Sequence, residues 1–251
     1  ILPAGLEMMD RLAIKAAEAF VNVGYPLDAE GLLICELDGT DAEVQHQIEK
    51  LRLILDKNNA IQVRVATDAA ERMQLWLGRK AAFPAVGRLA PDYYCMDGTI
   101  PRSELAAVLA QITKFSEQHG LDVANVFHAG DGNLHPLILY DANKAGEIER
   151  AEAFGADILN LCIEVGGTIT GEHGVGVEKI DQMCIQFTPE ELELFHGVKS
   201  AFDESRILNP GKAVPTLSRC AEFGAMHVHT DGSQQTHVGL NAQKYSDLER
   251  F

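Results

Sequence analysis

The chain has 251 residues, 46% of them hydrophobic and 23% charged, a composition typical of a folded globular protein. Its 21 lysines and arginines against 37 aspartates and glutamates give a net charge of −16, which argues against nucleic-acid binding. It contains no apolar run of the roughly 18 residues that a membrane span requires. Five cysteines without paired spacing, and the lack of a signal peptide, predict reduced thiols and a cytoplasmic protein.

The first half alternates helical and strand patterns. Apolar spacing predicts a helix over 6–23, and a short apolar run predicts a strand over 31–37. Asp41 caps a helix, a strand with alternating apolar residues covers 61–66, and another helix starts at Asp68. The helix from Asp41 is expected to bury an apolar stripe made of Val44, Ile48, Leu51 and Leu55.

The second half repeats this alternation up to Pro215, after which a histidine-rich, irregular tail follows. Its expected strands are 93–96, 123–127 and 137–140, and its expected helices are 105–119, 146–165 and 189–202. The pattern predicts an α+β fold, with an antiparallel or mixed sheet and flanking helices. Two such units in succession indicate a duplicated ferredoxin-like arrangement.

A histidine turn, Phe127-His128-Ala129-Gly130-Asp131-Gly132-Asn133-Leu134-His135-Pro136, joins two of the apolar strands. His128 and His135 stand at the two mouths of this hairpin loop, where their rings can converge. Two rigidly held imidazoles suit a divalent metal such as zinc. The alternative is that each histidine only hydrogen-bonds the backbone of the turn.

A glycine loop, Gly166-Gly167-Thr168-Ile169-Thr170-Gly171-Glu172-His173-Gly174-Val175-Gly176, carries a Glu-His pair. So many glycines predict a backbone that comes close to another group, although such loops also cap helices and bind nothing. Glu172 offers a hard oxygen ligand, and His173 titrates near neutral pH. Together with His128 and His135, Glu172 would complete a His₂Glu metal site with an open coordination position.

Three further segments are candidates. Arg79, on or at the end of a helix, has the geometry to hold a carboxylate by two hydrogen bonds, although most surface arginines are only solvated. Asn209, in Asn209-Pro210-Gly211-Lys212, belongs first to a helix stop. In the tail, Cys220, His227 and His229 have ligand chemistry but no recognised spacing.

These segments together resemble the C-terminal part of the FAD-linked 2-hydroxy-acid oxidases. Besides the histidine turn, the matching segments are Leu6-Glu7-Met8-Met9-Asp10, Pro91-Asp92-Tyr93-Tyr94-Cys95-Met96-Asp97-Gly98, Gly171-Glu172-His173-Gly174, Leu208-Asn209-Pro210-Gly211-Lys212 and Cys220-Ala221-Glu222-Phe223-Gly224-Ala225-Met226-His227. The similarity covers nearly the whole chain. The tail is similar to that of the catalytic D subunits of bacterial glycolate oxidases.

The resemblance implies that residues 1–214 form the substrate domain and that 215–251 form an irregular tail. In this family an N-terminal domain holds most of the FAD, and we expect that domain to be absent from this chain. A fragment of this kind is then inactive by itself. The implied reaction oxidises a small 2-hydroxy acid to the 2-oxo acid by transfer of a hydride to FAD.

The resemblance also implies roles for particular residues. His128, His135 and Glu172 would bind a divalent metal, zinc above others, and His173 would be the catalytic base. Arg79 would hold the substrate carboxylate, and Asn209 would lie near the flavin.

The chain departs from relatives that oxidise 2-hydroxyglutarate at two positions. Those relatives have a lysine where Cys95 stands and an asparagine where Leu137 stands. Loss of both polar partners disfavours a second carboxylate, because its charge would be buried unpaired. The expected substrate is therefore glycolate or D-lactate, between which the residues do not decide.

Two other functions stay open: a metallohydrolase with the same His₂Glu ligands, and a non-catalytic interaction module of a multi-subunit complex. The resemblance implies a second flavin-domain subunit and an iron–sulfur subunit as partners. Through them, a cytoplasmic protein without a membrane span would be held at the inner membrane.

Overall fold

The computed structural model of the chain describes residues 1–216, 220, 226–227 and 237–238. It divides into two compact units, Ile1–Ile158 and Leu159–Phe251. Among the described residues, no helix has the length and apolar character needed to cross a bilayer. The histidine turn belongs to the first unit, and the glycine loop belongs to the second.

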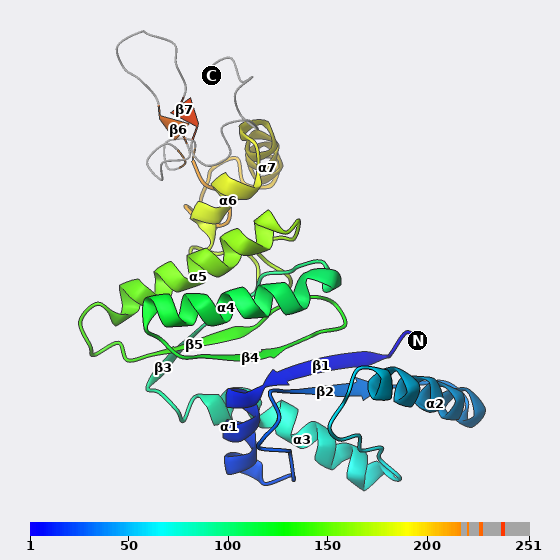
Figure 1. The fold of residues 1–251 in the computed structure, drawn as a ribbon. Coiled ribbons are helices and arrows are strands. Elements are labelled where there is room, and N and C mark those ends of the chain that lie inside the picture. The colour runs from blue at the N-terminus through cyan, green and yellow to red at the C-terminus, as the bar shows by residue number, and fades with distance from the viewer. Residues whose placement is uncertain (217–219, 221–225, 228–236, 239–251) are drawn as a thin grey trace. The chain divides into compact units, whose positions relative to one another are not determined.

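A five-stranded sheet forms the centre of the first unit (Figure 1). In the order β2-β1-β4-β5-β3, every neighbouring pair is antiparallel. The predicted α+β fold with an antiparallel sheet and flanking helices is therefore confirmed, and strands from both halves of the alternating pattern join one sheet. The strands are β1 (Gly5–Asp10), β2 (Gly31–Glu36), β3 (Asp92–Cys95), β4 (Val123–Phe127) and β5 (Pro136–Tyr140).

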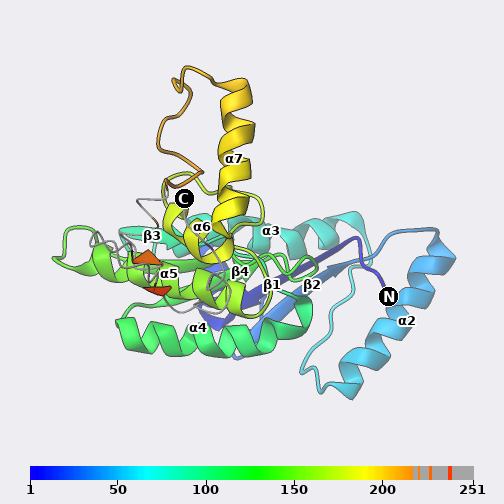
Figure 2. The ribbon, with the colours of Figure 1, turned by 90° about the horizontal axis from the view of Figure 1, so that it is seen from above.

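Helices cover both faces of this sheet. α1 (Arg11–Val21) and α3 (Ala69–Val86) lie on one face, whereas α4 (Leu105–His119) and α5 (Glu147–Glu164) lie over the other (Figures 1 and 2). A short 3₁₀ turn, η1 (Arg102–Glu104), leads into α4. Each large apolar side chain that is fully buried in such a core stabilises the fold by about 1.5–3 kcal/mol. The core under α1 and α3 includes Met9, Ile14, Ala82, Val86 and Val126.

The first predicted helix was wrong over its first five residues, because 6–10 belong to strand β1 and helix α1 begins only at Arg11. Asp10 makes the change. Its Oδ1 accepts a hydrogen bond from the backbone N–H of Ala13 at 2.9 Å, which caps α1. Its Oδ2 accepts from the backbone N–H of Asn125 at 2.8 Å, which fixes β1 beside β4. Burial raises the pKa of Asp10 from its usual value.

The segment 61–66 was predicted to be a strand, and it is irregular in the structure. A strand needs a hydrogen-bonded neighbour as well as apolar alternation, and the five-stranded sheet does not include this segment. The helix before it, α2 (Asp41–Lys57), is confirmed, but Thr40 and not Asp41 caps it, in a capping box with Glu43. Its apolar stripe, expected to be buried, is only half-buried.

The second unit contains α6 (Ile180–Gln186), α7 (Pro189–Phe202) and the short strands β6 (Met226–His227) and β7 (His237–Val238). The predicted helix over 189–202 is confirmed, and a capping box of Thr188 and Glu191 begins it. α6 was not predicted, because its seven residues are too few for a clear helical period.

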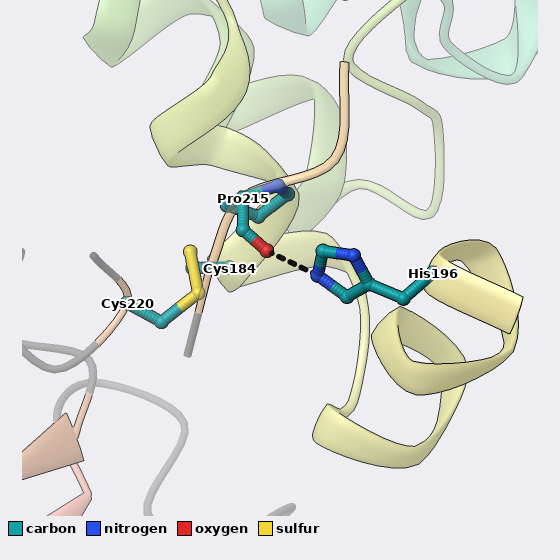
Figure 3. The surroundings of a disulfide bond; sticks show 4 residues. All are labelled: Cys184, His196, Pro215 and Cys220. Carbon is teal, nitrogen blue, oxygen red and sulfur yellow. Dashed lines mark hydrogen bonds between the residues drawn. A yellow bond between two sulfur atoms is a disulfide. The ribbon is translucent and has the colours of Figure 1, made fainter. Parts of the chain in front are cut away.

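The expectation that all five cysteines are reduced was wrong. Cys184 and Cys220 form a disulfide, with their Cα atoms 5.4 Å apart (Figure 3). The two cysteines are 36 positions apart, which gives no local spacing signal, so only the path of the chain brings the pair together. The bond also removes Cys220 as a thiolate ligand. Of the other two residues of that tail candidate, His227 lies in a short strand and His229 lies outside the described residues.

Candidate functional site

The histidine turn closes the hairpin between β4 and β5, as its position in the sequence predicts. The rings of His128 and His135 lie with their centroids 5.4 Å apart and their planes at 85° (ring edge to ring face). His135 is buried, and Phe83 of α3 lies against its ring. The prediction that the two imidazoles converge is confirmed, whereas their role as metal ligands stays a prediction.

Backbone hydrogen bonds fix the turn to two other segments. The N–H of Gly130 donates to the carbonyl of Leu6 at 2.9 Å, and the carbonyl of Gly132 accepts from Ile100 at 2.9 Å. Only glycine fits at 132, because its φ is +72° and a Cβ atom would lie 2.2 Å from the carbonyl oxygen of Ile100. The two histidines are therefore carried by a rigid loop.

A buried carboxylate, Glu7 of β1, links the turn to α3. Its Oε1 lies 2.8 Å from Nδ1 of His128, and its Oε2 accepts from Nε and Nη2 of Arg79 at 3.0 and 2.8 Å. The Glu7 and Arg79 side chains are each only 10% exposed. The carboxylate oxygens of Glu7 accept hydrogen bonds from the guanidinium, and we assign Nδ1 of His128 as the donor of its contact with Oε1. In the neutral form of an imidazole with its proton on Nδ1, Nε2 is the nitrogen that can bind a metal.

Glu7 is a residue that the sequence reasoning missed. It was read as part of a helix, where a glutamate among apolar residues attracts no notice. In a strand, alternate side chains share a face, so Glu7 points to the same side as buried Met9. A strand assignment would therefore have indicated a buried carboxylate.

Arg79 is buried in α3, against the expectation for an ordinary surface arginine. Two of the five N–H donors of its guanidinium bond Glu7, which leaves the group capable of further hydrogen bonds. Gly78 beside it allows a close approach, since a Cβ atom there would lie 2.3 Å from the ring of Tyr25. The Tyr25 hydroxyl donates to the carbonyl of Leu75. Burial raises the pKa of Tyr25 to about 12.

The glycine loop of the second unit is more open. The side chains of Glu172 and His173 are 52% and 48% exposed, and His173 Nε2 lies 3.9 Å from Glu172 Oε1. The Thr170 hydroxyl accepts from the N–H of Gly174 at 2.9 Å, which holds the loop locally. A methyl group built on Gly174 or Gly176 would meet no atom of the described residues within 4 Å, so their positive φ values, not close packing, account for these two glycines.

Asn209 has a φ of +44°, in the left-handed region where asparagine is tolerated better than most residues. Its side-chain oxygen accepts from Nζ of Lys212 at 3.5 Å. Its predicted contribution to flavin binding stays a prediction.

Cys95 and Leu137, the two positions expected to influence substrate choice, are directly opposite each other in the antiparallel pair of β3 and β5. Leu137 is buried, and Cys95 packs partly buried against the same core. Cross-strand partners have Cβ atoms about 5 Å apart, so a change at either position acts on the same small volume.

Comparison with known proteins identifies the family. Residues 1–213 match the family described as FAD linked oxidases, C-terminal domain. The chain belongs to this family. It is 63% identical to the glycolate oxidase subunit GlcD of Escherichia coli strain K12 over 251 residues, which is 100% of this chain and 48% of the relative. It is 37% identical to GlcD of Bacillus subtilis strain 168 over 84% of the chain and 45% of that relative.

Similarity extends to another enzyme name and to solved structures. A mitochondrial D-lactate dehydrogenase [cytochrome] of Arabidopsis thaliana is 30% identical over 84% of the chain and 37% of its own length. A crystal structure of p-cresol methylhydroxylase with bound substrate has a TM-score of 0.58 at 16% identity, over 85% of this chain and 47% of that one. This structural likeness supports the fold alone. The chain spans about half the length of the GlcD relatives, 48% and 45%.

Proposed function

We propose that this chain is the substrate domain of a flavin-dependent oxidoreductase that oxidises a small 2-hydroxy acid, glycolate or D-lactate, to the 2-oxo acid. The observation that carries the proposal is the pair of adjacent imidazoles in the histidine turn, one of them oriented by the buried carboxylate of Glu7. The relatives named as glycolate oxidase subunits and D-lactate dehydrogenases support the substrate class.

The proposed domain covers residues 1–214, with 215–251 as a tail, in keeping with the family match over 1–213. We propose that a separate N-terminal domain, outside this chain, holds most of the FAD. When bound, FAD supplies the acceptor for the substrate's hydride. Asn209 is proposed to contribute to flavin binding, on the resemblance of its segment to the family.

The donor set of the histidine turn fits a divalent metal, zinc above others, because neutral imidazole nitrogens are preferred zinc ligands. His128 and His135 would supply two of them, and Glu172 is proposed as the third ligand on the family resemblance. When bound, the cation supplies a positive charge that lowers the pKa of the substrate hydroxyl. Glu7 would keep the His128 ring in the tautomer and orientation that binding needs.

His173 is proposed to accept the proton of the substrate hydroxyl. An imidazole suits this step, since its ordinary pKa is near neutral pH. Arg79 is proposed to hold the substrate carboxylate with the donors that Glu7 does not use, which would orient the hydrogen to be removed. Glu7 would in turn fix the guanidinium plane.

The chemistry at Cys95 and Leu137 favours a substrate with one carboxylate. Neither side chain can pair with a second carboxylate, and an unpaired buried charge is strongly disfavoured. We therefore propose that the enzyme rejects 2-hydroxyglutarate.

We also propose that the chain works in a complex with a second flavin-domain subunit and an iron–sulfur subunit. The similarity to GlcD, which is named as a subunit of glycolate oxidase, supports an assembly of this kind. Through these partners the protein would stand in the cytoplasm at the inner membrane.

The test is a chimera in which this chain replaces the matched C-terminal half of E. coli GlcD, co-expressed with the other subunits of that oxidase. Glycolate-dependent reduction of a redox dye is the expected result. The His173→Ala chimera should lose about 10²–10⁴-fold in kcat, the usual contribution of a general base. His46→Ala, at an exposed position of α2, is the matched control and should retain activity.

A chimera that binds FAD but reduces no dye with glycolate or D-lactate would contradict the proposed reaction. Full activity of His173→Ala would contradict the base assignment alone. Ester or peptide hydrolysis by the zinc-loaded chain without flavin would favour the metallohydrolase.

A further inference from the structure

An apolar groove of about 490 Å³ lies along the outer edge of β2 in the first unit. The residues of β2 form one side of it, the apolar stripe of α2 lines it, and the irregular segment 60–66 lines it as well. We call it the β2 groove. The proposed site residues do not line it, so its role is independent of the proposed chemistry.

Two segments at this groove could pair with a further strand, and within the described part of the chain neither does so. β2 ends the strand order of the sheet, so among the described residues no strand pairs with its outer edge. The segment Ile61–Ala66 alternates apolar and polar residues like a strand, yet is irregular. An open edge next to an unpaired apolar segment is a template for one more strand.

The apolar stripe of α2 beside the groove also lacks a full cover. Val44, Ile48, Leu51 and Leu55 recur at helical spacing and line the groove, but each is only half-buried. Ile61 and Val63 are 75% and 39% exposed, and Leu33 on β2 is 56% exposed. Apolar stripes of this kind normally cover a core, so the groove lacks an apolar occupant.

We propose that the β2 groove receives a β-strand from the polypeptide that precedes the matched region in the longer relatives. The inserted strand pairs with β2 on one side and with 61–66 on the other, and its apolar side chains cover the stripe of α2. The chain matches 48% of E. coli GlcD, so that relative has ample further polypeptide. The net charge of −16 disfavours a second copy of this acidic chain as the occupant.

The position of the first residues supports this source. The N–H of Ala4 donates to the carbonyl of Glu36, a groove-lining residue at the end of β2. Ile1 is three residues away, within about 10 Å along an extended chain. Figures 1 and 2 both show the N-terminus beside α2. A preceding segment would therefore join the chain next to the groove that it fills.

The topology also sets the connection. β1 lies on the inner side of β2, so a strand on the outer side can reach β1 only by passing over β2. Such crossovers take a dozen or more residues, usually as a helix, and a strand with its crossover helix takes about 30. Exposed Leu33 is a surface that this crossover can cover.

The experiment compares the present chain with a version extended at its N-terminus by the residues, about 30 to 40, that precede the matched half of E. coli GlcD. Amide hydrogen exchange is measured in both. In the extended chain, the amides of Ile61–Ala66 should gain at least about tenfold protection, equivalent to about 1.4 kcal/mol of local stability. Unchanged protection there would overturn the proposal.

Two variants of α2 provide a matched pair, since Leu51 lines the groove and Leu53 is outside the lining and 69% exposed. In the extended chain, Leu51→Asp should abolish the gained protection, whereas Leu53→Asp should leave it intact. In the present chain neither substitution should change the stability much. A loss of protection in the extended Leu51→Asp chain is therefore not expected to come from a failure to fold. Equal effects of the two variants on the protection would overturn the proposal. It would also be overturned if the present chain dimerised in light scattering and its amides of 61–66 gained the same protection on dimerisation.

Discussion

The histidine turn and the glycine loop are both rich in glycine, but their surroundings differ. The turn lies between two strands, is hydrogen-bonded to Leu6 and Ile100, and has one histidine oriented by buried Glu7. In the loop, Glu172 and His173 are about half exposed, and the Thr170 hydroxyl accepts from the N–H of Gly174. The turn is therefore fixed by bonds to other segments of its unit, whereas the Glu-His pair of the loop is open to solvent.

The largest expected difference between the two regions is the effect of removing a carboxylate on the free energy of unfolding. Glu7→Ala leaves the guanidinium of Arg79 buried without its counter-ion, and we expect the free energy of unfolding to fall by about 3–5 kcal/mol. Urea denaturation measures the loss. Glu172→Ala, in the exposed loop, should change it by less than about 0.5 kcal/mol. Equal losses would show that the two regions do not differ in rigidity.

Zinc binding sharpens the same contrast. At a free zinc concentration of 100 times its Kd, the chain should gain about 2.7 kcal/mol in unfolding free energy. His135→Ala should remove the gain, and Glu7→Gln should weaken zinc binding by about 10–100-fold through the orientation of His128. Titration calorimetry gives the affinities, with His119→Ala as the control. Unaltered affinity in His135→Ala would contradict the metal assignment.

The glycines themselves give a third test. Gly132→Ala and Gly174→Ala both place alanine at positive φ, +72° and +81°, which alone costs about 1–2 kcal/mol. Only Gly132 also meets a backbone oxygen, at 2.2 Å. The Gly132 variant should therefore be the less stable of the two by at least about 1 kcal/mol in urea denaturation. A smaller loss at Gly132 than at Gly174 would contradict the rigid turn.

The smallest expected effect is a pH dependence of the stability that comes from Tyr25, which packs against α3, the helix that carries Arg79. The pKa of Tyr25 is raised from 10.0 to about 12, mainly because burial disfavours the phenolate. Its stabilising contribution is therefore complete below pH 10.0 and is lost as the pH rises towards 12. Tyr25→Phe should lose about 1 kcal/mol at neutral pH and show a flatter decline above pH 10. Parallel urea midpoints of both proteins over this range would contradict the assignment.

Several elements could be predicted because their signals are local. The helix from Asp68, the helix over 105–119 and the hairpin of β4 and β5 follow from caps, apolar periods and a glycine turn. The convergence of His128 and His135 followed as well, since a hairpin brings its two ends together. In these cases neighbours in sequence determine the structure.

Other features depend on residues far away along the chain. Leu6–Asp10 is a strand because β2 and β4 pair with it, whereas 61–66 has the same kind of apolar residues and is irregular. The bond between Glu7 and His128 joins residues separated by 121 positions, and no local pattern indicates it. Secondary structure of short apolar segments is therefore decided by available partners.

The amino-acid sequence by itself determined the α+β class, the family and the residue types of the proposed site. Periodicity, turn chemistry and motif spacing each depend on residues that are close together in the sequence. Only the tertiary structure decided that Glu7 and Arg79 form a buried pair behind His128, that Cys184 bonds Cys220, and that the edge of β2 is open. Each of these depends on burial and on contacts between distant segments, and such contacts arise only when the chain has folded.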